Sequence, residues 1–568
     1  MNVTPPRTPR SARPTVPRAR RVPPLGDGAE PPADSRTFLA RAALLTAALS
    51  VAGALLGLAR DQALARLFGA GGETDAFLVA WTVPEFAATL LIEDGLALVL
   101  IPAFSLALSR RARGASGDPV RALVAETLPR LSLALVTAGG LVVAGAPALV
   151  GALAPGLPDP ALAVDCTRLT ATCVLSFGLA GYCSAALRAH RRFLAPAAIY
   201  VAYNTGVIAV MAVLGGRWGV RSAAAGVAAG GCLMVAVQLP VLLRQLRGKG
   251  AGGPEEDGAP QRRTGLALVC AVLLFALCRQ SQVLVERFLA SHLDPGAISH
   301  LNYAQKVAQI PMTLSLMLCT VTFPVVARAL ADGDTGRARE RVERDLALAA
   351  SVVLLGAATV VACAPQIIQV LFQRGAFTAQ DTAATAAVMR VYALGLLAQT
   401  LVGALVRSYF SDGRPSWYPP AAMTAGVAAT AGAGAWAVGP WGVSGIAAAN
   451  AAGITLTAVL LLGGARAGGG RGGARDASGR AARTVVPLRL RHVLMDLGRP
   501  LAAAVAAAAA GLLAASRFAA PLPGLLLGGL TVAVVFVLLG RVLGEQGVAA
   551  ALRSVRSVTG RLPYVRSR

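Results

Sequence analysis

The feature that most constrains the fold is a long series of apolar stretches, each able to cross a lipid bilayer. A helix needs roughly 20 apolar residues for this, and we count about 14 such stretches in the chain. They lie near residues 38–59, 76–108, 124–154, 167–187, 194–215, 221–243, 265–290, 298–329, 346–372, 382–410, 420–439, 441–463, 499–518 and 522–542. An all-α integral membrane protein with about 14 transmembrane helices is therefore predicted.

The residue types between and within these stretches favour helices over a barrel. Aromatic residues make up only 5% of the chain, whereas transmembrane barrels carry girdles of them. The 62 glycines suit helices that pack closely through small residues. We therefore expect a bundle of helices in direct backbone contact.

The arginines alternate between the loops in a way that predicts the orientation in the membrane. With the N-terminus inside, inner segments carry arginine clusters, at residues 110–113, 188–192, 244–263, 337–344, 464–498 and after 543. Outer loops carry almost none, at residues 154–165, 291–299 and 439–444. The exceptions are Arg217, Arg221 and Arg374. Both termini are thus expected to be cytoplasmic, and contact with membrane lipids explains the net charge of +25 without a nucleic-acid partner.

Two parts of the chain echo each other. "RDQALARLFGAGGETDAFLVAWTVPEF" (60–86) and "ERFLASHLDPGAISHLNYAQKVAQIP" (286–311) both combine a charged helix end, a glycine loop and a polar helix interrupted by proline. A duplicated transporter lobe has this organisation. The expected order is a disordered basic cytoplasmic tail (1–37), a six-helix lobe (38–246), a cytoplasmic linker (247–264), a second six-helix lobe (265–465), a basic cytoplasmic linker (466–498), two C-terminal helices (499–544) and a basic cytoplasmic tail (545–568).

Charged side chains cluster in the first two helices of each expected lobe. Each costs about 3 kcal/mol near the bilayer centre and is a candidate for function. Six are candidate substrate ligands: Arg60, Asp61, Asp75, Arg279, Arg287 and Lys306. Three are candidates for gating or ion coupling: Glu93, Asp94 and Glu286. Arg60 and Asp61 are expected near the outer rim of the first helix, where they could instead pair or snorkel at the interface.

Cations inside a membrane protein favour an anionic ligand, because desolvated Arg and Lys form strong hydrogen bonds with phosphate or carboxylate. The sequence contains no phosphate-binding loop, no H-E-x-x-H and no aspartate-rich magnesium motif. The eight cysteines lack metal-ligand spacing and are interpreted as packing residues. No cofactor or metal is expected, and a membrane transferase is disfavoured.

Three segments together resemble a known family. "GLARDQALARLFGAGGETDAFLVAWTVPEF" (57–86), "FLASHLDPGAISHLNYAQKVAQIP" (288–311) and "LFQRGAFTAQDT" (371–382) are similar to the MurJ/MviN lipid II flippases of the multidrug/oligosaccharidyl-lipid/polysaccharide exporter superfamily. The resemblance implies two six-helix lobes in a V around a cationic cavity, followed by two helices that form a hydrophobic groove. It also implies a bacterial cell-membrane flippase that moves an undecaprenyl-diphosphate-linked peptidoglycan precursor by alternating access, with cell-wall synthesis proteins as possible partners.

The chain departs from this family pattern at several positions. Ala54 stands where the family has an arginine in its first helix, and residues 84–95 lack the usual arginines. Lys306 stands where the family has arginine, and Gln305 replaces an aspartate. Two alternatives therefore stay open: an exporter of another polyprenyl-linked glycan, and a scaffold for wall synthesis that transports nothing.

Overall fold

The described part of the chain is a bundle of helices joined by short turns. The computed structural model describes residues 33–93, 95–114, 117–247, 266–317, 334–410, 415–466 and 488–544, with no strand among them. Within these residues, twelve helical spans are long and apolar enough to cross a membrane. The all-α membrane class is therefore confirmed.

The number of crossings, predicted as about 14, is not settled by this count. Helix α15 (Tyr418–Arg466) contains both predicted segments 420–439 and 441–463, with a break at Gly442, where φ is 52°. The predicted segment 298–329 begins with α11 (Ala297–Ala308) and then runs into residues outside the described ranges.

Residues 33–247 form the first group of helices, called the N-terminal lobe here. Its helices are α1 (Ala33–Phe68), α2 (Gly72–Ala80), α3 (Thr82–Ala87), the π-helical turn η1 (Ala88–Glu93), α4 (Gly95–Ala112), α5 (Pro119–Leu153), α6 (Pro160–Ala171), α7 (Cys173–Ala189), α8 (Leu194–Trp218) and α9 (Arg221–Arg247). Helix α8 packs against α1 and α9. A Cβ atom on Gly206 would lie only 2.9 Å from the Cα of Gly230, so close packing through small residues is confirmed here.

Residues 266–466 form the second group, called the C-terminal lobe. It contains α10 (Leu266–Ala290), α11, α13 (Thr335–Phe372), α14 (Ala379–Phe410) and α15. Helix α13 bends at Cys363, two residues before Pro365. Because proline has no N–H, the carbonyl of Val361 lacks its usual helical donor, and Arg390 Nε of α14 donates to it at 3.1 Å.

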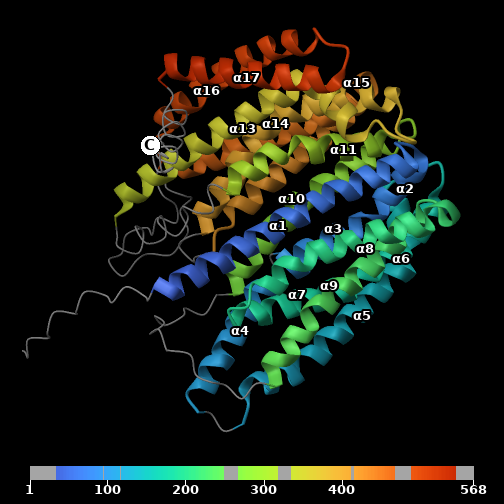
Figure 1. Cartoon of the computed structure of the whole chain (residues 1–568), viewed down its shortest axis with the longest axis vertical. Coiled ribbons are helices and arrows are strands. Elements are labelled where there is room, and N and C mark those ends of the chain that lie inside the picture. The colour runs from blue at the N-terminus through green and yellow to red at the C-terminus, as the bar shows by residue number, and fades with distance from the viewer. Residues whose placement is uncertain are drawn as a thin grey trace, which may run out of the picture.

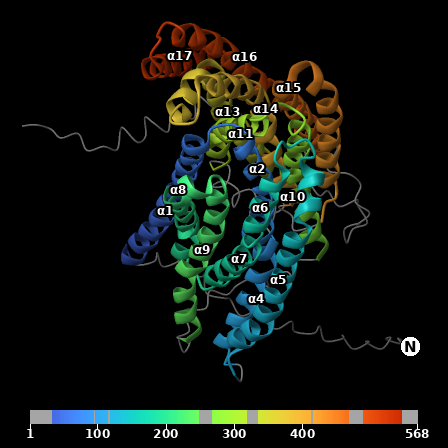
Figure 2. The same ribbon diagram turned by 90° about the vertical axis from the view of Figure 1, so that its right-hand side faces the viewer.

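The last two helices, α16 (Leu490–Ala515) and α17 (Pro521–Val542), pack on α13. Figures 1 and 2 show this red pair on the far side of the C-terminal lobe from the blue-to-green N-terminal lobe. Helix α16 begins inside the predicted linker 466–498, and α1 begins inside the predicted tail 1–37. Residues 1–32, 248–265, 467–487 and 545–568 lie outside the described ranges, so the predicted domain boundaries stay predictions.

The two lobes meet at the end that carries the predicted outer loops. There the Gly156 amide donates to Ser291 Oγ at 3.4 Å, and the Ala376 amide donates to the carbonyl of Arg66 at 2.9 Å. Helix α11 also contacts α2, and α10 contacts α3 and α4. The predicted inner end of the molecule lies opposite these contacts.

Candidate substrate-binding site

The charge pair of the first helix lies inside the helix rather than at its rim. Because α1 continues to Phe68, Arg60 lies about 12 Å before the helix end. Its guanidinium donates to Asp61 Oδ1 at 2.8 Å from Nη2 and at 3.1 Å from Nε. Nη1 donates to Asn204 Oδ1 of α8 at 3.2 Å. The helix is longer than the predicted apolar segment 38–59, because the residues after Asp61 extend it instead of ending it.

Lys306 brings a second cation to this cluster from the other lobe. Its Nζ lies 3.6 Å from Asp61 Oδ2, so Asp61 lies between two cations. Both cations also lie over Trp81, with Arg60 Cζ at 4.4 Å and Lys306 Nζ at 5.4 Å from the ring centroid. The cluster encloses a cavity of only about 10 Å³. Arg60 and Lys306 therefore approach each other through Asp61, and little space is left between their side chains.

Arg287 forms a second ion pair between the lobes. From α10 it donates through Nη2 to Glu85 Oε2 at 2.8 Å and through Nη1 to Thr82 Oγ1. Glu85 and Thr82 belong to α3 of the N-terminal lobe. Arg287 is almost fully buried, and these two partners offset the cost of removing its guanidinium from water.

Glu286 points into its own lobe, as expected for the neighbour of Arg287 on a helix. The Tyr392 hydroxyl of α14 donates to Glu286 Oε2 at 2.6 Å, and Asn450 Nδ2 of α15 donates to Oε1. Glu286 is buried among the three helices α10, α14 and α15. Glu286 thus bonds inside the C-terminal lobe, while its neighbour Arg287 bonds to the N-terminal lobe.

Asp75 belongs to α2 and contacts the start of α11, away from the cations. Its Oδ2 accepts from the Gly296 amide at 2.7 Å, and its Oδ1 accepts from the Ser299 amide at 2.7 Å and from the Ser299 hydroxyl. A carboxylate at the first turn of a helix satisfies free amides and complements the helix dipole. An acid of the N-terminal lobe therefore caps a helix of the C-terminal lobe.

The remaining predicted residues lie apart from the Arg60 cluster. Glu93 accepts a hydrogen bond from the Tyr200 hydroxyl at 3.1 Å. Arg279 is exposed and, within the described ranges, makes no hydrogen bond or ion pair. Asp94 lies outside the described residues. In the described part of the chain, no three His, Cys, Asp or Glu side chains are grouped as metal ligands.

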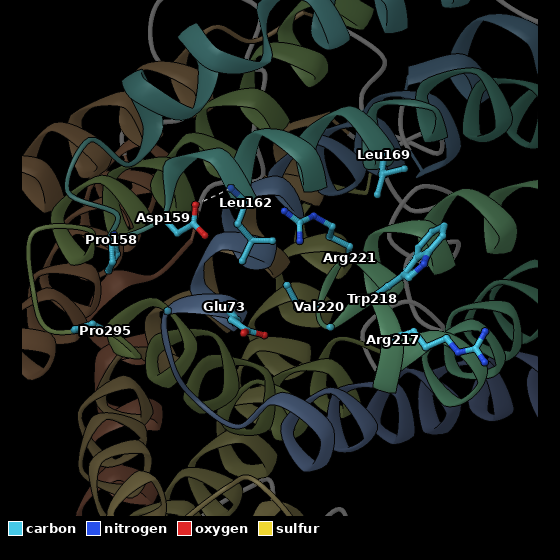
Figure 3. Close-up of a pocket in the computed structure, with 12 residues that line it drawn as sticks. Glu73, Pro158, Asp159, Leu162, Leu169, Arg217, Trp218, Val220, Arg221 and Pro295 are labelled. Carbon is cyan, nitrogen blue, oxygen red and sulfur yellow. Dashed lines mark hydrogen bonds between the residues drawn. The ribbon is translucent and has the colours of Figure 1, made fainter.

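Two larger hollows border the lobes. One, of about 410 Å³, lies between α1 and α8 and is lined by Arg188 and Asn204. The other, of about 880 Å³, lies beside the predicted outer loops and contains two of the arginines that break the loop pattern, Arg217 and Arg221. Figure 3 shows Glu73, Trp218 and Arg221 around it, with Pro295 at its edge.

Three residues of the site were not among the predicted candidates: Thr82, Trp81 and Asn204. Asn204 is a polar residue inside an apolar segment, and that signal could have identified it. No sequence pattern marks Thr82 or Trp81, because their role depends on how α3 faces α10 and α11.

Two lobes of membrane-spanning helices that share partly buried ion pairs across their contact have the architecture of a two-lobed membrane transporter. The sequence model of a family described as lipid II flippase MurJ matches residues 64–539. The chain therefore belongs to the MurJ family, whose members are transporters and not enzymes.

Related sequences agree with this assignment. A probable lipid II flippase MurJ of Rhizobium meliloti is 26% identical over 63% of this chain and 68% of its own length. The lipid II flippase MurJ of Burkholderia cenocepacia is 26% identical over 66% of this chain and 73% of its own.

A MurJ structure in an inward closed conformation matches 88% of the chain and 99% of its own, at 18% identity with a TM-score of 0.67. An inward-facing multidrug transporter of the MATE family matches 74% of the chain and 96% of its own, at 14% identity with a TM-score of 0.57. These two likenesses concern the fold.

Proposed function

We propose that this chain moves an undecaprenyl-diphosphate-linked peptidoglycan precursor from the inner to the outer leaflet by alternating access. The observation that carries the proposal is the Arg60, Asp61 and Lys306 cluster, in which cations of both lobes share one carboxylate. A diphosphate can replace Asp61 as the partner of both cations, because phosphate accepts the same charge-assisted hydrogen bonds. Substrate binding would then change the contact between the lobes.

The other predicted residues receive roles around this cluster. Arg287 and Arg279 are further ligands for the anionic headgroup, and Glu93, Asp94 and Glu286 serve gating or ion coupling. We assign Asp75 to closing the outer end, because it is buried and joins α2 to the start of α11 in the other lobe.

The distribution of arginine supports a bacterial cell membrane location with both termini in the cytoplasm. Membrane lipids surround the helices, and cell-wall synthesis proteins are the protein partners expected for this function.

Depletion of the protein in its own cells tests the proposal. Exposure of the lipid-linked precursor on the outer face of the membrane should fall as the protein is lost. Unchanged exposure in a strain without a second flippase would reject transport. Normal complementation by a variant that lacks both Arg60 and Lys306 charges would favour a scaffold instead.

A further inference from the structure

The cavity of about 410 Å³ between α1 and α8 contains a cation with no role in the site above. Arg188, at the end of α7, lines it together with Ser50, Tyr200 and Asn204. Its volume lies within the range of small-ligand sites. The cavity is therefore large enough for a polar headgroup fragment.

This cavity adjoins the central cluster. Asn204 lines it and also accepts the hydrogen bond from Arg60 at 3.2 Å. Tyr200, on the same wall, donates to Glu93. Gly95 follows Glu93 by two residues, and its backbone faces Leu273 of α10. The cavity is thus bordered by residues that contact Arg60 and Glu93.

Among the residues that the structure describes, Arg188 has no counter-ion in this cavity. It is half-buried, and within the described residues its guanidinium makes no hydrogen bond or ion pair. A partly desolvated arginine gains most from an anion that accepts two of its N–H groups. Arg192, four residues later, is exposed and lies outside the cavity lining.

We propose that this cavity is a binding place for a phosphate or carboxylate group of the substrate, with Arg188 as its ligand. It lies on the predicted inner side of Arg60, so the headgroup meets Arg188 before the central cluster. This inference rests on the proposed function and adds a substrate ligand to it. A phospholipid headgroup carries the same phosphate chemistry, and the experiment must separate the two sources.

The test uses the full chain reconstituted in vesicles with an undecaprenyl-diphosphate-linked glycan as the transported probe. Arg188→Gln should raise the substrate concentration for half-maximal rate about tenfold, which corresponds to ~1.4 kcal/mol, and leave the maximal rate within about twofold. Arg188→Lys should keep most of the affinity, and Arg192→Gln should match the wild type.

Three results would overturn the inference. The first is equal behaviour of Arg188→Gln and Arg192→Gln. The second is disappearance of the Arg188→Gln effect in vesicles made without anionic phospholipid, which would make a lipid headgroup the ligand. The third is loss of maximal rate without any change in half-maximal concentration. A wild-type protein that moves no probe rejects the proposed function itself, which is a different result.

A second variant tests whether the cavity is the place of binding. Ala54 lines the same cavity from α1. Ala54→Arg in the Arg188→Gln background places a cation on the opposite wall and should restore at least half of the lost affinity. A double variant with the wild-type melting temperature but no recovered affinity would contradict a shared cavity.

Discussion

Asp61 and Asp75 both reach from the N-terminal lobe to α11, but they meet different partners there. Asp61 meets Lys306 near the end of α11, while Asp75 meets the amides of Gly296 and Ser299 at its start. About 15 Å of helix separates the two contacts. Asp75 and its partners at the helix start are buried, whereas the Lys306 side chain is 27% exposed and can exchange its carboxylate for phosphate. The comparison separates a contact that closes the lobes from one that a substrate can open.

The largest effect is expected when the Asp75 carboxylate that caps α11 is removed. Asp75→Ala should cost the contact between the lobes at least ~3 kcal/mol, because two buried amides and a hydroxyl lose their acceptor. Spin labels at positions 158 and 295, on either side of the contact, should report a longer distance. The control is Asp159→Ala, which removes a cap within α6, where Asp159 accepts from the Leu162 amide at 2.9 Å. An unchanged label distance in Asp75→Ala would contradict the closing role.

The central contact is tested through Lys306. Lys306→Ala should lower transport about a hundredfold, because Asp61 and the diphosphate that replaces it lose the cation of the C-terminal lobe. Lys306→Arg should stay within about threefold of the wild type, since the charge is retained. The measurement is probe transport into vesicles. Normal transport by Lys306→Ala would show that the central cation does not meet the substrate.

Glu85 sharpens the comparison, because its pair with Arg287 also joins the lobes but is partly open to solvent. The Glu85 side chain is 24% exposed, so Glu85→Gln should weaken the lobe contact by only about 1 kcal/mol. The spin labels at positions 158 and 295 should show that the population with separated lobes rises about fivefold. Glu126→Gln is the matched control, because Glu126 pairs with Arg130 on the surface of a single helix. Equal effects of the two variants would remove Glu85 from the lobe contact.

The smallest effect is expected at the outer hollow. Arg221 and Asp165 form an exposed pair at 2.8 Å, with 46% and 45% of their side chains exposed. Arg221→Gln should change the free energy of unfolding by less than ~0.5 kcal/mol and leave transport unchanged. Denaturant unfolding and the vesicle assay check both. A clear loss of transport would place this hollow on the substrate path.

The sequence was sufficient to predict the helical membrane class and the charged positions, since apolar length and the cost of buried charge are local properties. It could not predict which way each charge faces. Glu286 and Arg287 are neighbours, yet only the packing of α10 decides that one enters its own lobe and the other crosses to α3.

Helix ends were the other source of error. The residues after Asp61 contain no helix-breaking proline or glycine before Gly69, and this pattern already favoured a longer α1 than the apolar segment 38–59. Asp75 was predicted as a ligand because it matches a functional position of the family that the sequence resembles. Its actual partners are backbone amides, which no side-chain pattern reveals.

The bend in α13 has a consequence for how the whole protein moves. The final helical pair, α16 and α17, rests on α13, and its glycines approach the bend closely: a Cβ on Gly528 would lie 2.7 Å from Cys363 Sγ. The pair is therefore attached to the C-terminal lobe alone within the described residues. Whenever the halves rock, it travels with α13 and sweeps through the surrounding lipid instead of tethering the halves together.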